Sequence, residues 1–100
     1  MIAKENILAI AKKAILSESE AIVKLIDFLD DDFVKTTEII FNTEGRLIVT
    51  GIGKSAIIAQ KIVATMNSTG TPSMFLHASE AIHGDLGMVQ PGDVVICISK

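Results

Sequence analysis

The feature that most constrains this chain is a pair of glycines between a short apolar run and an amphipathic segment. The apolar run covers residues 46–50, and Gly51, Gly53, Lys54 and Ser55 follow it almost at once. A short apolar run that ends in glycine is typical of a buried parallel strand. Glycine lets backbone N–H groups approach an anion closely, and the N-terminus of a following helix favours negative charge. The segment therefore predicts a phosphate-binding loop.

The segments around this loop predict an α/β fold with a parallel sheet. Two helices are expected before it, and the pattern after it alternates helices with short apolar strands that right-handed crossovers would join. Asp31 or Asp32 is expected to cap the second helix, and Gly45 to end it. The expected helices are residues 3–29, 31–42, 56–68 and 78–83, and the expected strands are residues 46–50, 73–77 and 93–99.

The order of these elements predicts two parts, a helical segment at residues 1–45 and the first part of a sheet domain at residues 46–100. The last strand has no covering helix after it, so we expect the domain to be incomplete. Apolar residues recur along the first helix at spacings of three, four or seven, which forms a stripe that so small a sheet cannot cover. We therefore expect oligomerisation. The stripe consists of Ile7, Ile10, Ala14, Ala21, Leu25 and Phe28.

Composition excludes several classes of function. The net charge is −3, and no Lys/Arg stripe with interleaved aromatic residues is present, which argues against a nucleic-acid partner. The single cysteine, Cys97, cannot form an internal disulfide. The N-terminus mixes charged with apolar residues and lacks the apolar stretch of a signal peptide or membrane span. We expect a cytoplasmic protein with no membrane partner.

Three kinds of phosphate loop were compared with the sequence. A nucleotide P-loop needs a glycine at position 48, which is Ile48. A dinucleotide loop is matched by Gly51, Gly53 and Ala56, but the acidic residue expected about 20 positions later is missing, because His77 stands near that place. A monophosphate or sugar-phosphate loop uses the same physics without a second motif. Lys54 and Ser55 favour it over a strand–helix turn that binds nothing.

His77 and His83 form a second group of interest. His77 ends the second predicted strand, the region where open α/β sheets bind ligands. Imidazole can move protons near neutral pH or bind a metal, yet two histidines six residues apart match no standard zinc spacing. From the residues alone, a hydrogen-bonded structural histidine is the simpler interpretation of each.

Three motifs together resemble one family. Residues 49–55 (VTGIGKS), 68–73 (STGTPS) and 77–88 (HASEAIHGDLGM) are similar to the bacterial arabinose-5-phosphate isomerases of the SIS (sugar isomerase) fold. The resemblance covers residues 47–99. It implies a Rossmann-like, three-layer α/β sandwich, usually tetrameric. It also implies interconversion of D-ribulose 5-phosphate and D-arabinose 5-phosphate, which supplies Kdo for lipopolysaccharide.

The resemblance also assigns roles to residues. Lys54 matches a catalytically relevant lysine and His83 a substrate-site histidine, while His77 matches a position where zinc binds without being catalytic. No cofactor is implied, and zinc enters only as an inhibitor. The family's catalytic carboxylate, a second histidine and, in many members, paired CBS domains lie later in the chain, so residues 1–100 alone are expected to be inactive. The predicted substrate-binding residues are Gly53, Ser55, Gly70, Thr71, His83 and Ser99, the last being where the family's serine-rich phosphate loop begins.

Two other functions remain open at this point. SIS folds also occur as sugar-phosphate sensors in regulators, which bind without turnover and usually carry a DNA-binding helix-turn-helix. Residues 1–45 lack the basic character that such a segment needs. An isomerase acting on a hexulose phosphate is the nearer alternative, and the stretch HGDLG at residues 83–87 favours the pentose enzyme over it.

Overall fold

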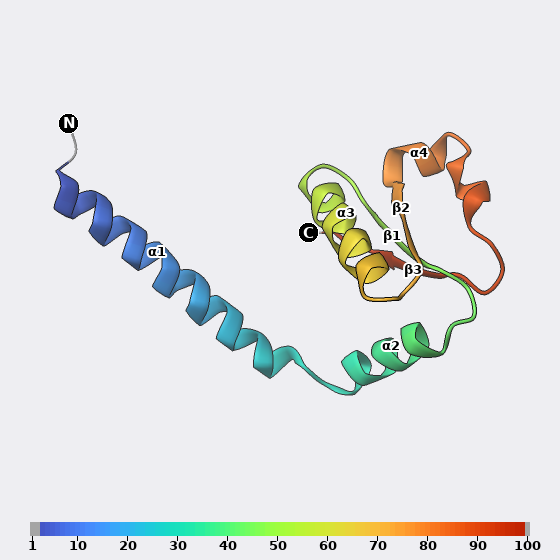
Figure 1. Cartoon of the computed structure of the whole chain (residues 1–100), viewed down its shortest axis with the longest axis horizontal. Helices are drawn as coiled ribbons and strands as arrows, with labels where there is room; N and C mark the ends of the chain where they lie inside the picture. The colour runs from blue at the N-terminus through green and yellow to red at the C-terminus, as the bar shows by residue number, and fades with distance from the viewer. Residues whose placement is uncertain (1–2, 100) are drawn as a thin grey trace. The chain divides into compact units, whose positions relative to one another are not determined.

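Residues 3–99 are described by a computed structural model, in which the chain forms two compact units, residues 1–35 and residues 36–100. The first unit holds α1 (Lys4–Lys24) and the 3-10 helix η1 (Leu25–Phe28), and α2 (Asp31–Asn42) begins in it (Figure 1). The sequence predicted one helix over residues 3–29. The α-helix instead ends at Lys24, and the chain tightens into η1. No described helix is long and apolar enough to cross a membrane.

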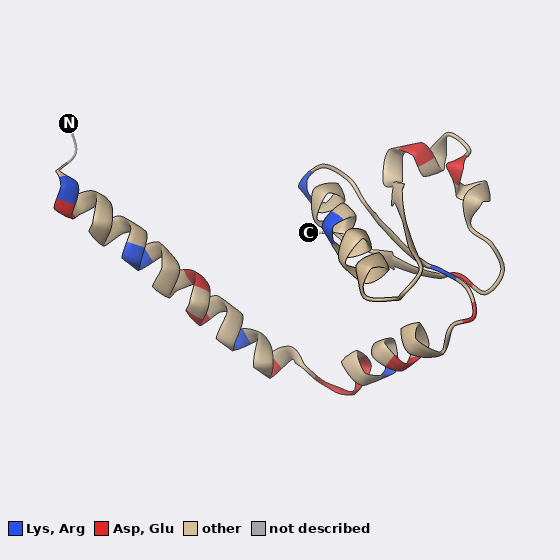
Figure 2. Ribbon diagram, in the orientation of Figure 1, with Lys and Arg blue, Asp and Glu red and all other residues tan. Residues whose placement is uncertain are grey.

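The apolar stripe of α1 is exposed in this unit. No α1 side chain is buried, and Ile10 and Ile22 keep 64% and 66% of their surfaces exposed. Lys and Glu residues are both spread along the same helix (Figure 2). Helices gain most of their stability in proteins from burying an apolar face. The predicted stripe is therefore left uncovered within its own unit, as far as residues 3–35 describe it.

The cap of α2 is Asp30, so the prediction of Asp31 or Asp32 was wrong by one or two positions. The Asp30 carboxylate accepts hydrogen bonds from the backbone N–H groups of Asp32 (3.0 Å) and Phe33 (3.2 Å). Asp31 and Asp32 lie inside the first turn of the helix. A capping side chain must precede the first turn of a helix in order to reach the N–H groups that have no partner within the helix. Asp30 is the acidic residue in that place.

The second unit is built on a parallel sheet of three strands, as the sequence predicted. The strands are β1 (Leu47–Gly51), β2 (Ser73–His77) and β3 (Val94–Cys97), in the order β2-β1-β3. α3 (Lys54–Ser68) connects β1 to β2, while α4 (Ala78–Ile82) and the 3-10 helix η2 (Asp85–Met88) connect β2 to β3 (Figure 1). In the register of the sheet, Gly51 of β1 lies opposite His77 of β2.

The core lies between β1 and α3. Leu47 and Val49 are fully buried and pack with Ala59 of α3. Ile48, which alternates with them and so faces the other side of the sheet, is also fully buried. A central strand that is buried on both faces explains the continuous apolar run of the sequence. Around this cluster pack the partly buried residues Ile40, Ile62, Val63, Met66, Phe75, Val94, Ile96 and Ile98.

Most predicted boundaries are close to those observed. β2 has the predicted bounds, and β1 is shifted by one residue, from 46–50 to 47–51. β3 is shorter than predicted, at residues 94–97 rather than 93–99, and α3 begins at Lys54 rather than at Ala56. The last difference matters for the site. Lys54 and Ser55 lie within the first turn of the helix and not in the loop before it.

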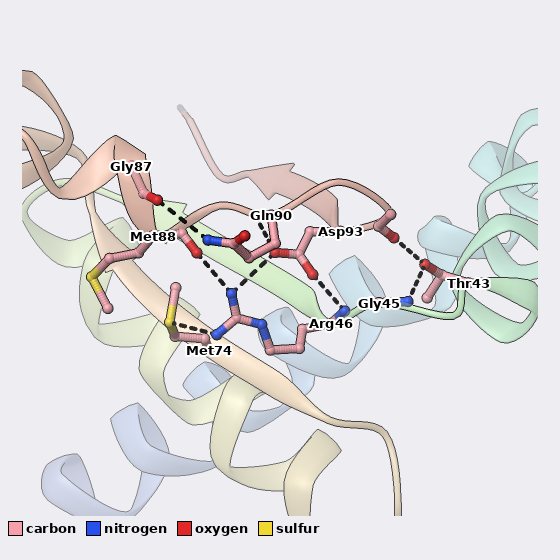
Figure 3. A network of polar contacts seen from close by, with 9 residues as sticks. Thr43, Gly45, Arg46, Met74, Gly87, Met88, Gln90 and Asp93 are labelled. Atoms are coloured by element: carbon pink, nitrogen blue, oxygen red, sulfur yellow. Dashed lines mark hydrogen bonds and ion pairs between the residues drawn. The ribbon is translucent and has the colours of Figure 1, made fainter.

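A polar cluster around Arg46 and Asp93 joins the start of β1 to the turn before β3 (Figure 3). Asp93 accepts hydrogen bonds from the Arg46 backbone N–H (2.7 Å), the Gln90 backbone N–H (2.7 Å) and the Arg46 guanidinium (3.1 Å). The guanidinium also donates to the Met88 carbonyl, at 2.7 Å. The backbone hydrogen bonds, first that of Arg46 and then that of Gln90, lower the pKa of Asp93 from 3.8 to about 2. This cluster fixes the relative position of the two strands at their amino ends.

Replacing Asp93 with Asn is expected to lower the Tm of the full-length protein near neutral pH, because the amide lacks the charge that two N–H groups and a guanidinium stabilise. The folded-state pKa lies below the ordinary value of 3.8. Ionised Asp93 therefore stabilises the fold fully above that value, and the contribution is lost as the pH falls through about 2. Thermal melts of wild type and variant should converge on acidification. Exposed Glu44, replaced with Gln, is the control, and a Tm difference that stays constant down to the folded-state pKa would contradict the account.

Candidate functional site

The glycine loop, residues 51–53, holds the first turn of α3 against the end of β1. Gly51 is buried, and a Cβ added there would lie 2.9 Å from both the carbonyl carbon and the carbonyl oxygen of Ser55. Both are backbone atoms, so neither can move aside as a flexible side chain would. Glycine is thus required at this position for the helix to begin directly beside the strand end.

Gly53 gives the loop its second constraint. Its φ of 62° and ψ of −131° lie in a region that residues with a Cβ rarely adopt. Its carbonyl accepts a hydrogen bond from the Ala56 N–H at 3.1 Å, which begins the helix, and no side chain caps this end of α3. The first N–H groups of a helix have no partner within the helix. At the mouth of α3 they can bind an anion, beside exposed Lys54 and partly buried Ser55.

His77 lies beside this loop, on the face of the sheet that α3 covers. Along β2, Phe75 and His77 point to the same face, and Phe75 packs against the cluster that contains Ala59 of α3. The rings of Phe75 and His77 meet edge to face with their centroids 6.0 Å apart. Because His77 is the register partner of Gly51, it lies at the strand end next to the one from which the glycine loop leaves.

His77 also caps α4. Its Nδ1 accepts a hydrogen bond from the Ser79 backbone N–H at 3.2 Å, and the Ser79 hydroxyl lies 2.7 Å from the same nitrogen. His83 occupies the other end of this short helix. There the residue is exposed, and its backbone N–H donates to the Glu80 carbonyl at 3.0 Å. Gly84 follows with a φ of 116°. The two histidines therefore stand at opposite ends of α4.

Ser99 follows β3 at the same end of the sheet. The N–H of Ile98 donates to the Thr50 carbonyl at 2.9 Å, which places the end of β3 beside the end of β1. Ser99 itself is exposed. The carboxyl end of the sheet thus brings together the glycine loop, Lys54, His77 and Ser99, which follows β3.

Gly70 and Thr71 lie at the opposite, amino end of the sheet. They follow α3 and precede β2, and the Thr71 N–H donates to the Met66 carbonyl at 2.9 Å to close the helix. Within this chain the structure does not bring them to Lys54. They border a hollow of about 370 Å³ lined by Ile40, Phe41, Thr43, Gly45, Thr69, Gly70, Thr71 and Pro72. The β–α–β order requires this separation, since α3 runs back along the sheet.

The zinc position carried over to His77 was compared with the ligands around it. Among residues 3–99, no three His, Cys, Asp or Glu side chains are grouped so that they could hold a metal ion. Structural zinc sites use four protein ligands and catalytic sites three. The Nδ1 of His77 is engaged by Ser79. A zinc ion at His77 would therefore need ligands from outside the described residues, and the zinc position stays a prediction.

Sequence reasoning missed Ser79 and Phe75, the two residues that hold His77. The signal for Ser79 was present, since a serine two positions after a strand-ending histidine lies in the first turn of the next helix. A side chain at the N-cap bonds N–H groups of that turn. Histidine is an uncommon capping residue, so the sequence alone does not predict that His77 caps α4.

The comparisons with known proteins agree on one family. The model of the SIS domain matches residues 40–100. A Haemophilus influenzae protein named "Probable arabinose 5-phosphate isomerase" is 52% identical over 94 residues, which cover 94% of this chain and 28% of that protein. The arabinose 5-phosphate isomerase GutQ of Escherichia coli K12 is 45% identical over 95 residues, which cover 95% of this chain and 30% of that protein.

A solved structure is similar over almost the whole chain. It is an Escherichia coli CFT073 protein in complex with arabinose 5-phosphate, which matches with a TM-score of 0.92 and 40% identity. The match covers 99% of this chain and 53% of that one. The chain therefore spans about 30% of the length of these curated relatives and about half of the solved neighbour.

The geometry of the glycine loop predicts a difference between two glycines. Gly53→Ala is expected to destabilise the full-length protein by about 1–3 kcal/mol, because alanine is strained at this φ and ψ even though its Cβ would meet no atom. Gly87→Ala is the matched control. A Cβ at Gly87 also meets nothing within 4 Å, and no positive φ is found there. Urea unfolding measures both, and equal stabilities of the two variants would contradict the assigned loop conformation.

Proposed function

Because this chain belongs to the SIS domain family, we propose that the full-length protein is an aldose–ketose isomerase that interconverts D-ribulose 5-phosphate and D-arabinose 5-phosphate. The relatives that carry this name, at 45–52% identity, support the assignment. The solved neighbour was crystallised with arabinose 5-phosphate, which supports a phosphorylated pentose as the ligand.

The observation that carries the proposal is the uncapped start of α3 beside the glycine loop. Gly51 and Gly53 let the helix begin directly at the strand end, and no side chain occupies its first N–H groups. Those groups, Ser55 and the Lys54 ammonium form a cradle of hydrogen-bond donors for an anionic oxygen. A sugar phosphate presents two kinds of such oxygens during isomerisation, those of its phosphate and those of the enediolate that forms at C1 and C2.

The reaction moves one proton between neighbouring carbons. A base removes the proton from C2 of the aldose, an enediolate forms, and the proton returns at C1 to give the ketose. A nearby cation stabilises the negative oxygen that develops. We assign this role, or that of a phosphate clamp, to Lys54, and we assign proton movement between the hydroxyl oxygens or opening of the sugar ring to His83. The carboxylate base is proposed to lie in the remainder of the full-length protein.

The finer parts of the proposal concern the surroundings of the enzyme. We propose that it works in the cytoplasm without a cofactor, supplies Kdo for lipopolysaccharide synthesis and assembles as a homotetramer. The exposed stripe of α1 supports assembly, because unpaired apolar helix faces usually mark interfaces. Gly70 and Thr71 are proposed as substrate contacts. Since they lie at the other end of the sheet from Lys54, they would need to be brought to the substrate from a second copy.

Turnover of D-ribulose 5-phosphate by the full-length protein tests the roles of the two side chains. Lys54→Ala is expected to lower kcat by about 10²–10³-fold, the usual value of one preorganised charge partner. His83→Ala is expected to lower it by about 10²–10⁴-fold, the usual value of a proton-transfer group. The measurement is formation of D-arabinose 5-phosphate by each variant, with folding checked by circular dichroism.

Lys61→Ala is the matched control for Lys54. Lys61 is an exposed lysine on the same helix, seven residues and therefore about two turns away, so it shares the face of Lys54 but not the helix mouth. Its replacement should leave kcat unchanged. Equal losses in both lysine variants, or near wild-type turnover by His83→Ala, would contradict the assigned roles. Tight binding of the sugar phosphate without any turnover by the wild type would favour a sensor instead.

A further inference from the structure

His77 is held from two sides at the junction of β2 and α4. The Phe75 ring meets it edge to face, and Ser79 contacts its Nδ1 twice, through the backbone N–H at 3.2 Å and through the hydroxyl at 2.7 Å. Each of these contacts limits rotation of the imidazole. Among residues 3–99, the ring has no other hydrogen bond and no other aromatic contact. The geometry therefore fixes Nδ1 and leaves Nε2 available to form a hydrogen bond with a ligand.

The Ser79 contacts determine which ring nitrogen carries the proton. A backbone N–H can only donate, so the nitrogen that faces it must present a lone pair. Neutral imidazole has one N–H and one bare nitrogen, which places the proton of His77 on Nε2. The hydroxyl of Ser79 can then also donate to Nδ1. His77 is partly exposed, and its Nε2 has no hydrogen-bond partner among residues 3–99.

The position of His77 in the sheet indicates which group this N–H can bind. His77 lies on the α3 face of the sheet and is the register partner of Gly51. The space where a Gly51 side chain would lie is filled by the backbone of Ser55, in the first turn of α3. This register places His77 at the strand end beside the helix mouth, and an Nε2 N–H that faces the mouth would add one neutral donor there.

We propose that Ser79 is a positioning residue that holds His77 with Nδ1 bare and Nε2 protonated, so that the imidazole donates a hydrogen bond to an oxygen of the phosphosugar beside the glycine loop. This inference rests on the proposed function, because it takes a phosphosugar as the ligand. It gives His77 a role other than that of the zinc ligand expected from the sequence. A metal takes the bare nitrogen of an imidazole, and the Ser79 contacts occupy that nitrogen in the cap of α4.

The tautomer of His77 can be measured without any ligand. Long-range ¹H–¹⁵N spectra of the full-length protein, labelled at histidine, should show Nε2 protonated and Nδ1 bare, with the signal assigned by its loss in His77→Asn. Ser79→Ala removes the hydroxyl but keeps the backbone N–H, and should shift the tautomer ratio toward protonated Nδ1 by roughly two- to tenfold, the effect of one ordinary hydrogen bond. Ser79→Thr should restore the wild-type ratio. Protonated Nδ1 in the wild type, or an unchanged ratio in Ser79→Ala, would overturn the role of Ser79.

A second experiment tests the donor role with D-ribulose 5-phosphate as the probe, by calorimetry on the full-length protein. Asparagine is a good N-cap, so His77→Asn can keep the cap of α4 while it removes Nε2. We expect its Tm to stay near wild type and its affinity to fall about tenfold, the effect of one hydrogen bond to a charged group. Wild-type affinity in this variant would overturn the donor role.

The two experiments separate the inference from the proposed function. If the wild type does not bind D-ribulose 5-phosphate at all, the proposed function fails, while the tautomer spectra still decide the role of Ser79. If it binds and Lys54→Ala weakens binding but His77→Asn does not, the function stands and the donor role of His77 is wrong.

Discussion

The close approach between the end of β1 and the first turn of α3 is the constraint on which the rest of the structure depends. It exists because Gly51 has no side chain, since a Cβ would meet the Ser55 backbone at 2.9 Å. With the helix started there, Ala59 falls on Leu47 and Val49 and closes the core. The same contact leaves the first N–H groups of α3 uncapped at the carboxyl end of the sheet. The packing of the core and the proposed anion site thus share one cause.

The two ends of the sheet differ in their polar contacts. At the amino end, Arg46 and Asp93 join β1 to the turn before β3 through hydrogen bonds to backbone groups, which fixes the strands in register. At the carboxyl end, by contrast, no side chain among residues 3–99 caps α3, and His77 is held by Ser79. The hydrogen bonds at the amino end hold the strands that carry the proposed site at the other end, and a catalytic or binding centre requires such fixed positions.

The sequence predicted the fold well because its signals are local. The run ending at Gly51 and the spacing of Ile62, Val63 and Met66 follow the periods of a strand and a helix, and the structure has both. The features that the sequence did not predict depend on contacts between distant residues or on details of local geometry. The Arg46–Asp93 cluster joins positions 47 residues apart, and the capping of α4 by His77 uses an uncommon residue type. The separation of Gly70 from Lys54 required the direction of α3 to be taken into account.

The central claim is that the phosphosugar binds at the carboxyl end of the sheet, where α3 begins. A crystal structure of the full-length protein with D-ribulose 5-phosphate tests it most directly. The account predicts ligand oxygens within hydrogen-bonding distance of the groups around Lys54 and Ser55, with the His77 imidazole beside them. A ligand bound solely in the hollow at the amino end, against Thr69 and Pro72 and without any contact to the mouth of α3, would contradict it.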